Sequence, residues 1–185
     1  GTPTPLGKSV RGYSIPLVAD ADTRQRLLGL DALDLYVPPL NASSRGGERY
    51  IFHAARLAET LTTALRAALP AKVLDGFSHV NPVFRASRFA PGDRKFKRHV
   101  DTPYYDAARK QVSRYTLLLY LTGGRGNPTL QIGEDLAITH IDAMTCVVFD
   151  QSLAHEGSAY EDGNKVFLRT ELVFTEPHVT HDDKL

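Results

Sequence analysis

The chain of 185 residues is long enough for one domain with a substantial core and short for two, so we expect a single domain spanning 1–185. Its 22 lysine and arginine residues nearly balance its 21 aspartate and glutamate residues, which argues against nucleic acid or an anionic membrane as a partner. No apolar run approaches the roughly 20 residues of a membrane span. A lone cysteine, Cys146, and the lack of a signal-peptide pattern predict a reducing, cytoplasmic location.

Residues 1–75 are predicted to form a helical region that supports the rest of the domain. Asp and Thr caps before an apolar stretch predict a short helix within 19–30, and the breaker-rich segment 37–50 predicts an exposed loop. From Ile51 to Leu69, apolar residues recur at helical spacing until Pro70 ends the pattern. This segment is the one long helix that we expect.

After Ala71 the chain consists of short apolar runs separated by turn signals. Their lengths and spacing are typical of strands, and they end at Pro-Gly, Gly-Gly, Gly-Asn and Asp-Gly pairs. The runs are NPVFRASRFAPGD, SRYTLLLYLTGG, PTLQIG, AITHIDAMTCVVFD and NKVFLRTELVF. Helices followed by strands favour helices packed on a sandwich or barrel. The domain is therefore expected to be mainly β with N-terminal helices, and residues 176–185 are expected to be a disordered tail.

The stretch KFKRHVDTPYY, residues 95–105, holds a candidate metal-binding pair. On an extended segment, side chains two apart point the same way, so His99 and Asp101 project together. His155, after the apolar strand CVVFDQSLA, stands where we expect a strand to end in a turn. Two histidines and one carboxylate on one face of a metal form the triad of non-haem Fe(II) oxygenases. The three residues are therefore our candidate iron ligands.

Such a centre leaves positions open for a 2-oxo acid, whose distant carboxylate needs a fixed cation. Lys165 and Arg169 share one face of the last predicted strand, with Phe167 between them. Arginine offers a two-pronged fork and lysine a point charge. The sequence does not decide which of the two would hold the carboxylate.

Three blocks of the sequence together resemble a known family. RFAPGDRKFKRHVD, RYTLLLYLT and HEGSAYEDGNKVFLRTELVF are similar, in order and spacing, to the catalytic core of the Fe(II)/2-oxoglutarate-dependent dioxygenases, in the prolyl 4-hydroxylase-like branch. The resemblance covers about residues 80–175 and implies a double-stranded β-helix, or jelly roll. It also implies that His99, Asp101 and His155 bind iron.

The resemblance further implies how 2-oxoglutarate is bound. Lys165 falls where this branch keeps its basic residue for the distal carboxylate, and Arg169 falls where other branches place theirs. Tyr120, which shares a strand face with Thr116 and Leu118, matches a tyrosine that donates a hydrogen bond to the same carboxylate. The chain departs from the pattern before its Pro-Gly turn, where Phe89 replaces a frequent tyrosine and removes a hydrogen-bond donor.

The expected function is hydroxylation of a C–H bond of a prolyl, amino-acid or peptide-like substrate, with release of succinate and CO2. Fe(II), 2-oxoglutarate and O2 are the expected cofactors and co-substrates, with ascorbate as a candidate reductant. A small molecule, a peptide or a protein can each be the substrate, and the sequence does not indicate an oligomeric state. Two alternatives stay open: a cupin-like metalloenzyme that does not use 2-oxoglutarate, and a non-catalytic ligand-binding domain of the same fold.

Two features near the triad also have competing interpretations. The basic run of Arg94, Lys95, Lys97 and Arg98 fits a solvated loop better than a polyanion site, because phosphate binding normally draws on a broader patch. Tyr104 and Tyr105 either line the substrate entrance or pack within a loop.

Overall fold

The computed structural model describes residues 2–7, 12–17, 21–38 and 46–176, and the predicted tail beyond Glu176 lies outside them. Three helices are present in the described chain: α1 (Ala21–Ala32), α2 (Ala55–Ala68) and α3 (Ala71–Leu74). The first seven strands are β1 (Thr4–Leu6), β2 (Gly12–Pro16), β3 (Glu48–His53), β4 (Phe77–Val80), β5 (Val83–Phe89), β6 (Phe96–His99) and β7 (Tyr105–Asp106). The remaining six are β8 (Gln111–Tyr120), β9 (Gly124–Ile132), β10 (Leu136–Ile141), β11 (Thr145–Asp150), β12 (His155–Gly157) and β13 (Lys165–Thr175).

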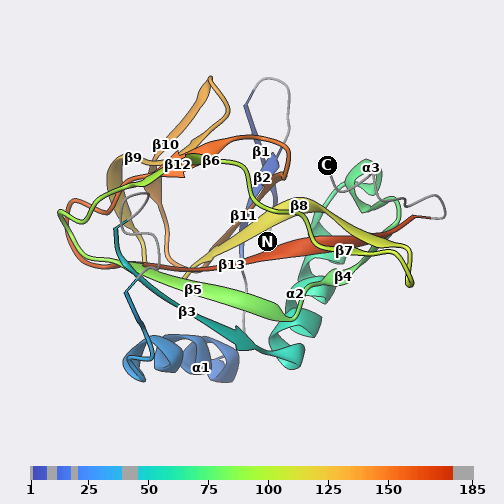
Figure 1. Ribbon diagram of the computed structural model, residues 1–185, viewed down its shortest axis with the longest axis horizontal. Coiled ribbons are helices and arrows are strands. Elements are labelled where there is room, and N and C mark those ends of the chain that lie inside the picture. The colour runs from blue at the N-terminus through green and yellow to red at the C-terminus, as the bar shows by residue number, and fades with distance from the viewer. Residues whose placement is uncertain (1, 8–11, 18–20, 39–45, 177–185) are drawn as a thin grey trace.

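The strands form two antiparallel sheets that make a jelly roll (Figure 1). The larger sheet has the order β1-β2-β11-β8-β13-β5-β3, with β4 added on β13 and β7 on β8. The smaller sheet has the order β10-β9-β12-β6. Helices α1 and α2 lie on the outer side of the larger sheet, near β3 and β5, and the smaller sheet lies on its other side. Strands β6 and β12 therefore face β13 and β5 across the interior of the roll.

Strand β8 shows why the sheets stack in this way. Its run of apolar residues is buried on both faces, because alternate side chains of a strand point to opposite sides of the sheet. Leu117 and Leu119 pack toward the helices, whereas Leu118 and Tyr120 pack toward the smaller sheet. A continuous apolar strand of this kind is typical of a sheet that is covered on both faces.

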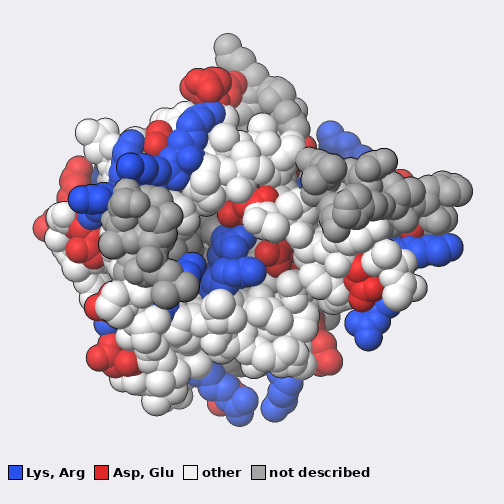
Figure 2. All heavy atoms as spheres, viewed as in Figure 1, with Lys and Arg blue, Asp and Glu red and all other residues white. Residues whose placement is uncertain are grey.

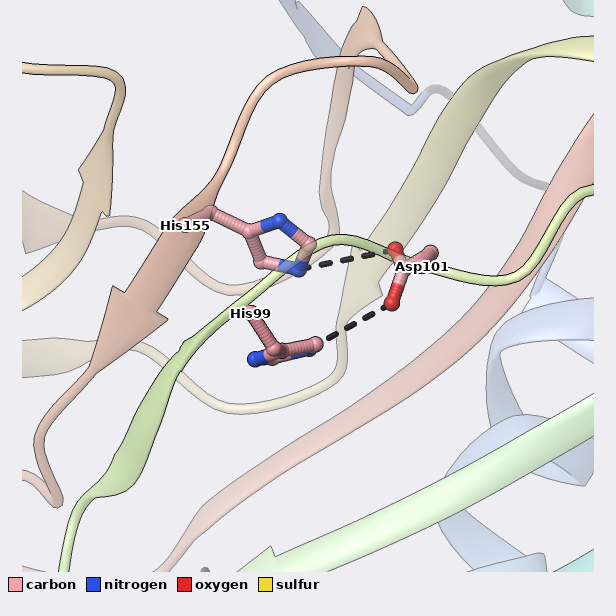
Figure 3. A group of neighbouring side chains, drawn as sticks. All are labelled: His99, Asp101 and His155. Atoms are coloured by element: carbon pink, nitrogen blue, oxygen red, sulfur yellow. Dashed lines mark ion pairs between the residues drawn. The ribbon is translucent and has the colours of Figure 1, made fainter. Parts of the chain in front are cut away.

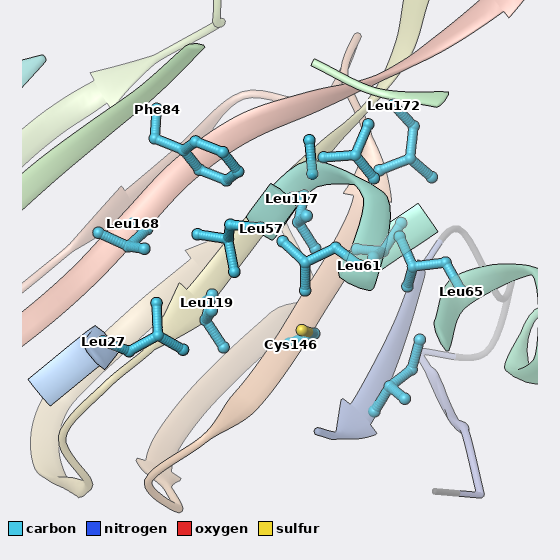
Figure 4. Close-up of a cluster of buried hydrophobic side chains, with 14 of the residues drawn as sticks. Leu27, Leu57, Leu61, Leu65, Phe84, Leu117, Leu119, Cys146, Leu168 and Leu172 are labelled. Carbon is cyan, nitrogen blue, oxygen red and sulfur yellow. The ribbon is translucent and has the colours of Figure 1, made fainter. Parts of the chain in front are cut away.

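The two faces belong to two separate hydrophobic clusters. The outer cluster joins the buried stripe of α2, formed by Leu57, Leu61 and Leu65, to the larger sheet (Figure 4). Cys146 lies buried in this cluster, and burial raises the pKa of its thiol to about 12, so it acts as a packing residue. The inner cluster lies between the sheets and combines residues of β8, β9, β10 and β11.

The N-terminal region differs in part from the sequence-based expectation. The helix expected from Ile51 to Leu69 is α2, but it begins at Ala55, because residues 48–53 pair with β5 as strand β3. Strands β1 and β2 were also not predicted, and β2 extends the larger sheet by pairing with β11. The helix expected within 19–30 is α1. The region is thus part of the β structure as well as a helical support.

None of the helices in the described part of the chain is long and apolar enough to cross a membrane.

Candidate metal centre

The smaller sheet places two histidines directly opposite each other. His99 is the last residue of β6 and His155 the first of β12, and the antiparallel register pairs the two residues. Residues opposite one another in such a pair have Cβ atoms about 5 Å apart, so their rings meet on the same face. The imidazole centroids are 4.3 Å apart. His155 thus begins a new strand after a turn, rather than standing at the end of β11 as expected.

Asp101 follows β6 and completes a cluster of three ligand-type side chains. Its Oδ1 lies 3.3 Å from His99 Nε2 and its Oδ2 lies 3.4 Å from His155 Nε2, as the dashed lines in Figure 3 mark. One ligand atom from each residue lies within 4.8 Å of the other two. The expected i, i+2 projection of His99 and Asp101 is therefore observed, and His155 supplies the third group.

Backbone hydrogen bonds orient both imidazole rings. His99 Nδ1 lies 2.7 Å from the carbonyl oxygen of Lys97, and His155 Nδ1 lies 3.3 Å from that of Leu153. A carbonyl oxygen only accepts, so the proton of each neutral ring belongs on Nδ1 and the Nε2 lone pair points toward Asp101. Two lone pairs and a carboxylate then converge on one point, and a cation is needed to hold them together.

Asp101 is held in its ionised form. Asp101 is only 6% exposed, and burial alone would raise its pKa, but the neighbouring side chains of His99, Arg169 and His155 hold the pKa well below its usual range. Thr116 Oγ1 also donates a hydrogen bond of 2.9 Å to Oδ2. Burial, together with the charge of His99, lowers the pKa of His155, so this ring favours its neutral, metal-binding form.

A cavity of about 240 Å³ opens beside the triad and extends along β13. All three triad residues line it, together with Tyr120, Phe89 and a further fourteen residues. Lys165, Phe167 and Arg169 are among these fourteen, so the expectation that the three share one strand face is confirmed. Tyr104 and Tyr105 are not among the lining residues, and Tyr105 instead pairs with β8. They are loop and edge-strand residues in this structure.

Lys165 is a buried cation whose partners are neutral. It is 4% exposed, and its Nζ donates to the carbonyl oxygens of Thr129, at 2.6 Å, and Ser158, at 2.9 Å. Within the described residues it forms no ion pair, and burial lowers its pKa from 10.5 to about 7. Gly157 makes room for this arrangement, because a Cβ there would lie 2.5 Å from the Thr129 oxygen and 3.0 Å from Nζ. The lysine is therefore suited to receive an anion.

Two hydroxyl groups near Lys165 can act as further donors. The buried Oγ1 of Thr129 has no hydrogen-bond partner among the described residues. Tyr120 lines the same cavity, and no hydrogen bond of its hydroxyl is found within the described chain. A buried hydroxyl without a partner is costly unless a ligand satisfies it. Thr129 was not singled out from the sequence, where it is one polar residue in the strand PTLQIG.

Arg169 occupies a different position from Lys165. Its Nη1 lies 3.2 Å from Asp101 Oδ1 and 3.7 Å from Glu171 Oε1. Four residues along a strand correspond to about 13 Å between Cα atoms, so the two cations lie toward opposite ends of the cavity.

The basic run of residues 94–98 forms ion pairs with acidic side chains of the smaller sheet and its turns. Lys95 pairs with Glu156 at 3.1 Å, and Arg98 pairs with Glu134 at 2.8 Å.

Comparison with known proteins gives a clear result for the fold. No protein-family model and no curated protein sequence matches this chain. A prolyl-4-hydroxylase of Pseudomonas putida superposes with a TM-score of 0.63 at 15% identity, covering 90% of this chain and 93% of that chain. The viral collagen prolyl hydroxylase of Paramecium Bursaria Chlorella virus-1, in its 2-oxoglutarate complex, gives 0.60 at 16% identity, with 89% and 97% covered. SnoK, a non-heme alpha ketoglutarate dependent carbocyclase of nogalamycin biosynthesis, gives 0.61 at 11% identity, with 100% and 94% covered.

These structures confirm the expected fold class, which is mainly β with a double-stranded β-helix core and N-terminal helices. More narrowly, the chain has the form of this fold that is found in prolyl 4-hydroxylases and other 2-oxoglutarate-dependent oxygenases.

Proposed function

We propose that this protein is an Fe(II)- and 2-oxoglutarate-dependent oxygenase that hydroxylates a C–H bond and releases succinate and CO2. One observation carries the proposal: a converging His-Asp-His triad lines the same cavity as a buried lysine that has no acidic partner among the described residues. The triad suits a divalent metal, and the lysine suits the carboxylate of 2-oxoglutarate that lies far from the metal. 2-Oxoglutarate requires both groups, because one of its ends binds the metal and the other binds a cation.

His99, Asp101 and His155 are the residues that would hold the metal. Their donor set of two imidazole nitrogens and one carboxylate oxygen is the one that non-haem Fe(II) oxygenases use. Both Nε2 atoms are free of protons in the neutral tautomers that Lys97 and Leu153 impose. Thr116 fixes Asp101 from behind, in the way that hydrogen-bonded neighbours commonly orient metal ligands.

Lys165, with the hydroxyls of Tyr120 and Thr129, is our proposed anchor for the distal carboxylate of 2-oxoglutarate. All three line the cavity, and the anion would balance a charge that, within the described part of the chain, is stabilised by two carbonyl oxygens. We assign the anchor to Lys165 rather than Arg169, because Arg169 lies directly beside the metal ligand Asp101, whereas Lys165 lies at the other end of the cavity. Phe89 and Phe167, with ring centroids 5.9 and 5.6 Å from Nζ, would exclude water from this end.

When bound, iron and 2-oxoglutarate supply the oxidation of a substrate C–H bond by O2, coupled to decarboxylation of the 2-oxo acid. The protein itself binds the metal through three side chains, orients the co-substrate between the triad and Lys165, and keeps water away with apolar walls. Proteins of this fold include both prolyl hydroxylases and a carbocyclase, so the fold alone does not select the substrate.

The experiment that tests the proposal is an anaerobic titration of the metal-free protein with Fe(II) and 2-oxoglutarate. We expect a visible metal-to-ligand charge-transfer band in the wild type, no band in His99→Ala, and a much weaker affinity for 2-oxoglutarate in Lys165→Met. A folded wild-type protein that binds Fe(II) without developing the band would support the cupin-like alternative. A protein that develops the band but never forms succinate from 2-oxoglutarate would support a non-catalytic binding domain.

A further inference from the structure

The cavity holds more positive charge than the proposed metal and co-substrate require. Four cationic side chains line it, and they are Arg49, Arg85, Lys165 and Arg169. Its lining acids are Asp101 and Glu156, and Glu156 is paired with Lys95 outside the triad. Figure 2 shows basic side chains deep in a hollow near the middle of this face, with acidic side chains at its edge. Arg49 and Arg85 have no role in the function proposed above, and Arg169 acts there only as a neighbouring charge of Asp101.

The three arginines lie together on one face of neighbouring strands. Arg85 on β5 pairs directly with Arg169 on β13, and Arg49 on β3 pairs with Ser87, two residues from Arg85. Opposite residues in antiparallel strands have Cβ atoms about 5 Å apart, and diagonal neighbours are about 7–8 Å apart. Like charges at these positions repel each other. Such a cluster therefore needs an anion nearby.

One acidic residue, Glu171, balances part of the positive charge of the three arginines. It is buried, and its Oε1 lies 3.3 Å from Arg85 Nη1 and 3.7 Å from Arg169 Nη1. Asn81 donates a further hydrogen bond of 2.9 Å to Oε2. Among the described residues, and with Asp101 assigned to the metal, the three guanidinium groups have this one carboxylate beside them, which leaves two positive charges unbalanced.

Two guanidinium groups still have free donors. Within the described residues, Arg49 makes no ion pair and no side-chain hydrogen bond, although it lines the cavity. The Nη1 atom of Arg169 is buried and has no hydrogen-bond partner there, because its contacts with Asp101 and Glu171 lack hydrogen-bond geometry. The proposed metal and Lys165 offset the charges of Asp101 and of 2-oxoglutarate. The charge of the arginine cluster is therefore not balanced by the metal site or by 2-oxoglutarate, and it is available to bind another anionic molecule.

We propose that Arg49, Arg85 and Arg169 bind an oxyanion of the substrate, a carboxylate or a phosphate, beside the triad. This inference rests on the proposed function and specifies its substrate class as an anionic molecule. A guanidinium fork binds either group through two parallel hydrogen bonds, and a partly enclosed site makes these charge-assisted bonds strong. A neutral prolyl residue within a peptide would leave the cluster uncompensated.

The first test measures anion binding directly. The protein is loaded with Ni(II) and saturating 2-oxoglutarate, so that the triad and Lys165 are occupied, and is titrated with acetate or methyl phosphate at constant ionic strength. Its melting temperature is the readout, because a ligand that binds only the native state raises it. We expect the apparent affinity for at least one of the two anions to fall about tenfold or more in Arg49→Gln, a change of about 1.4 kcal/mol. Arg56→Gln, at an exposed position on α2 outside the cavity, is the matched control and should behave as the wild type.

Arg49 is the residue to change because it supports no described side-chain contact, so its loss should leave the fold intact. Equal responses of the wild type, Arg49→Gln and Arg56→Gln would overturn the proposal. A response to acetate alone would identify a carboxylate substrate, and a response to methyl phosphate alone a phosphate ester. Arg49-dependent anion binding in a protein that shows no Fe(II)–2-oxoglutarate band would refute the proposed function but leave the anion site standing.

The second test uses succinate formation with carboxylic acids and their primary amides, and with phosphate esters and the parent alcohols. A compound that stimulates turnover should lose at least 100-fold in kcat/KM when its anionic group is neutralised. Arg49→Gln should raise its KM with little change in kcat, because Arg49 would bind the remote anion and not the reacting bond. A neutral substrate that the wild type and Arg49→Gln oxidise equally well would overturn the proposal.

Discussion

Replacement of Lys165 by methionine should stabilise the ligand-free protein and weaken 2-oxoglutarate binding. Methionine keeps the unbranched shape of the side chain and removes its charge. Burial lowers the pKa of Lys165 from 10.5 to about 7. At pH 7 this shift corresponds to a penalty of about 4 kcal/mol on the folded state, since one pKa unit is worth about 1.4 kcal/mol.

The variant avoids this penalty, but it also loses two hydrogen bonds, which offsets part of the gain in stability. The carbonyl oxygens of Thr129 and Ser158 lose a donor, at about 1 kcal/mol each. The net gain is about 2 kcal/mol, which for a chain of this size raises the melting temperature by about 4–8 °C. Loss of a charge-assisted carboxylate contact should weaken 2-oxoglutarate binding roughly 10- to 100-fold. Thermal unfolding and calorimetric titration measure the two effects.

The pH dependence provides an independent check. Between pH 7 and about 10.5, the unfolded lysine binds more protons than the buried one, so the stability of the wild type rises with pH relative to the variant. By pH 9 this rise amounts to about 2 kcal/mol, and the advantage of Lys165→Met should have disappeared. Lys72→Met, at an exposed position on α3, is the control and should show neither effect. A variant that melts below the wild type at pH 7, or that binds 2-oxoglutarate as tightly, would refute this reasoning.

Three further predictions concern the same cavity. Thr116→Val removes the hydroxyl donor to Asp101 and should weaken metal binding about 10- to 100-fold in a calorimetric titration, and unchanged affinity would show that Asp101 needs no such orientation. Thr129→Val keeps the shape of the side chain and removes a hydroxyl that has no hydrogen-bond partner in the described chain; we expect equal or higher stability with weaker 2-oxoglutarate binding, and unaltered binding would exclude Thr129 from the anchor. The affinity for 2-oxoglutarate should fall by up to tenfold per pH unit above pH 7, as Lys165 loses its proton, and a flat profile would contradict a protonated lysine as the anchor.

The strands and their faces follow from local patterns in the sequence. Alternation along β13 places Lys165, Phe167 and Arg169 on one face, and the apolar run of β8 indicates a strand covered on both sides. The helical spacing of Leu57, Leu61 and Leu65 likewise predicts α2. Strand β3 was missed because its residues directly precede the helical pattern, so that Ile51 was taken as the start of the helix. An element bound mainly by pairing with a distant strand carries a weak local signal.

The sequence by itself determined that the domain is mainly β with N-terminal helices, that His99 and Asp101 form a pair, and that two cations share the last strand, because these features depend on periodicities of two and 3.6 residues along short segments. Only the tertiary structure decided which groups meet. The register of β6 against β12 sets His155 across from His99, and the pairing of β13 with β5 sets Arg169 across from Arg85. The closure of the two sheets surrounds Lys165 with carbonyl oxygens and leaves Thr129 facing the cavity. Strand register and sheet closure arise from contacts between distant parts of the chain, and local periodicity does not encode them.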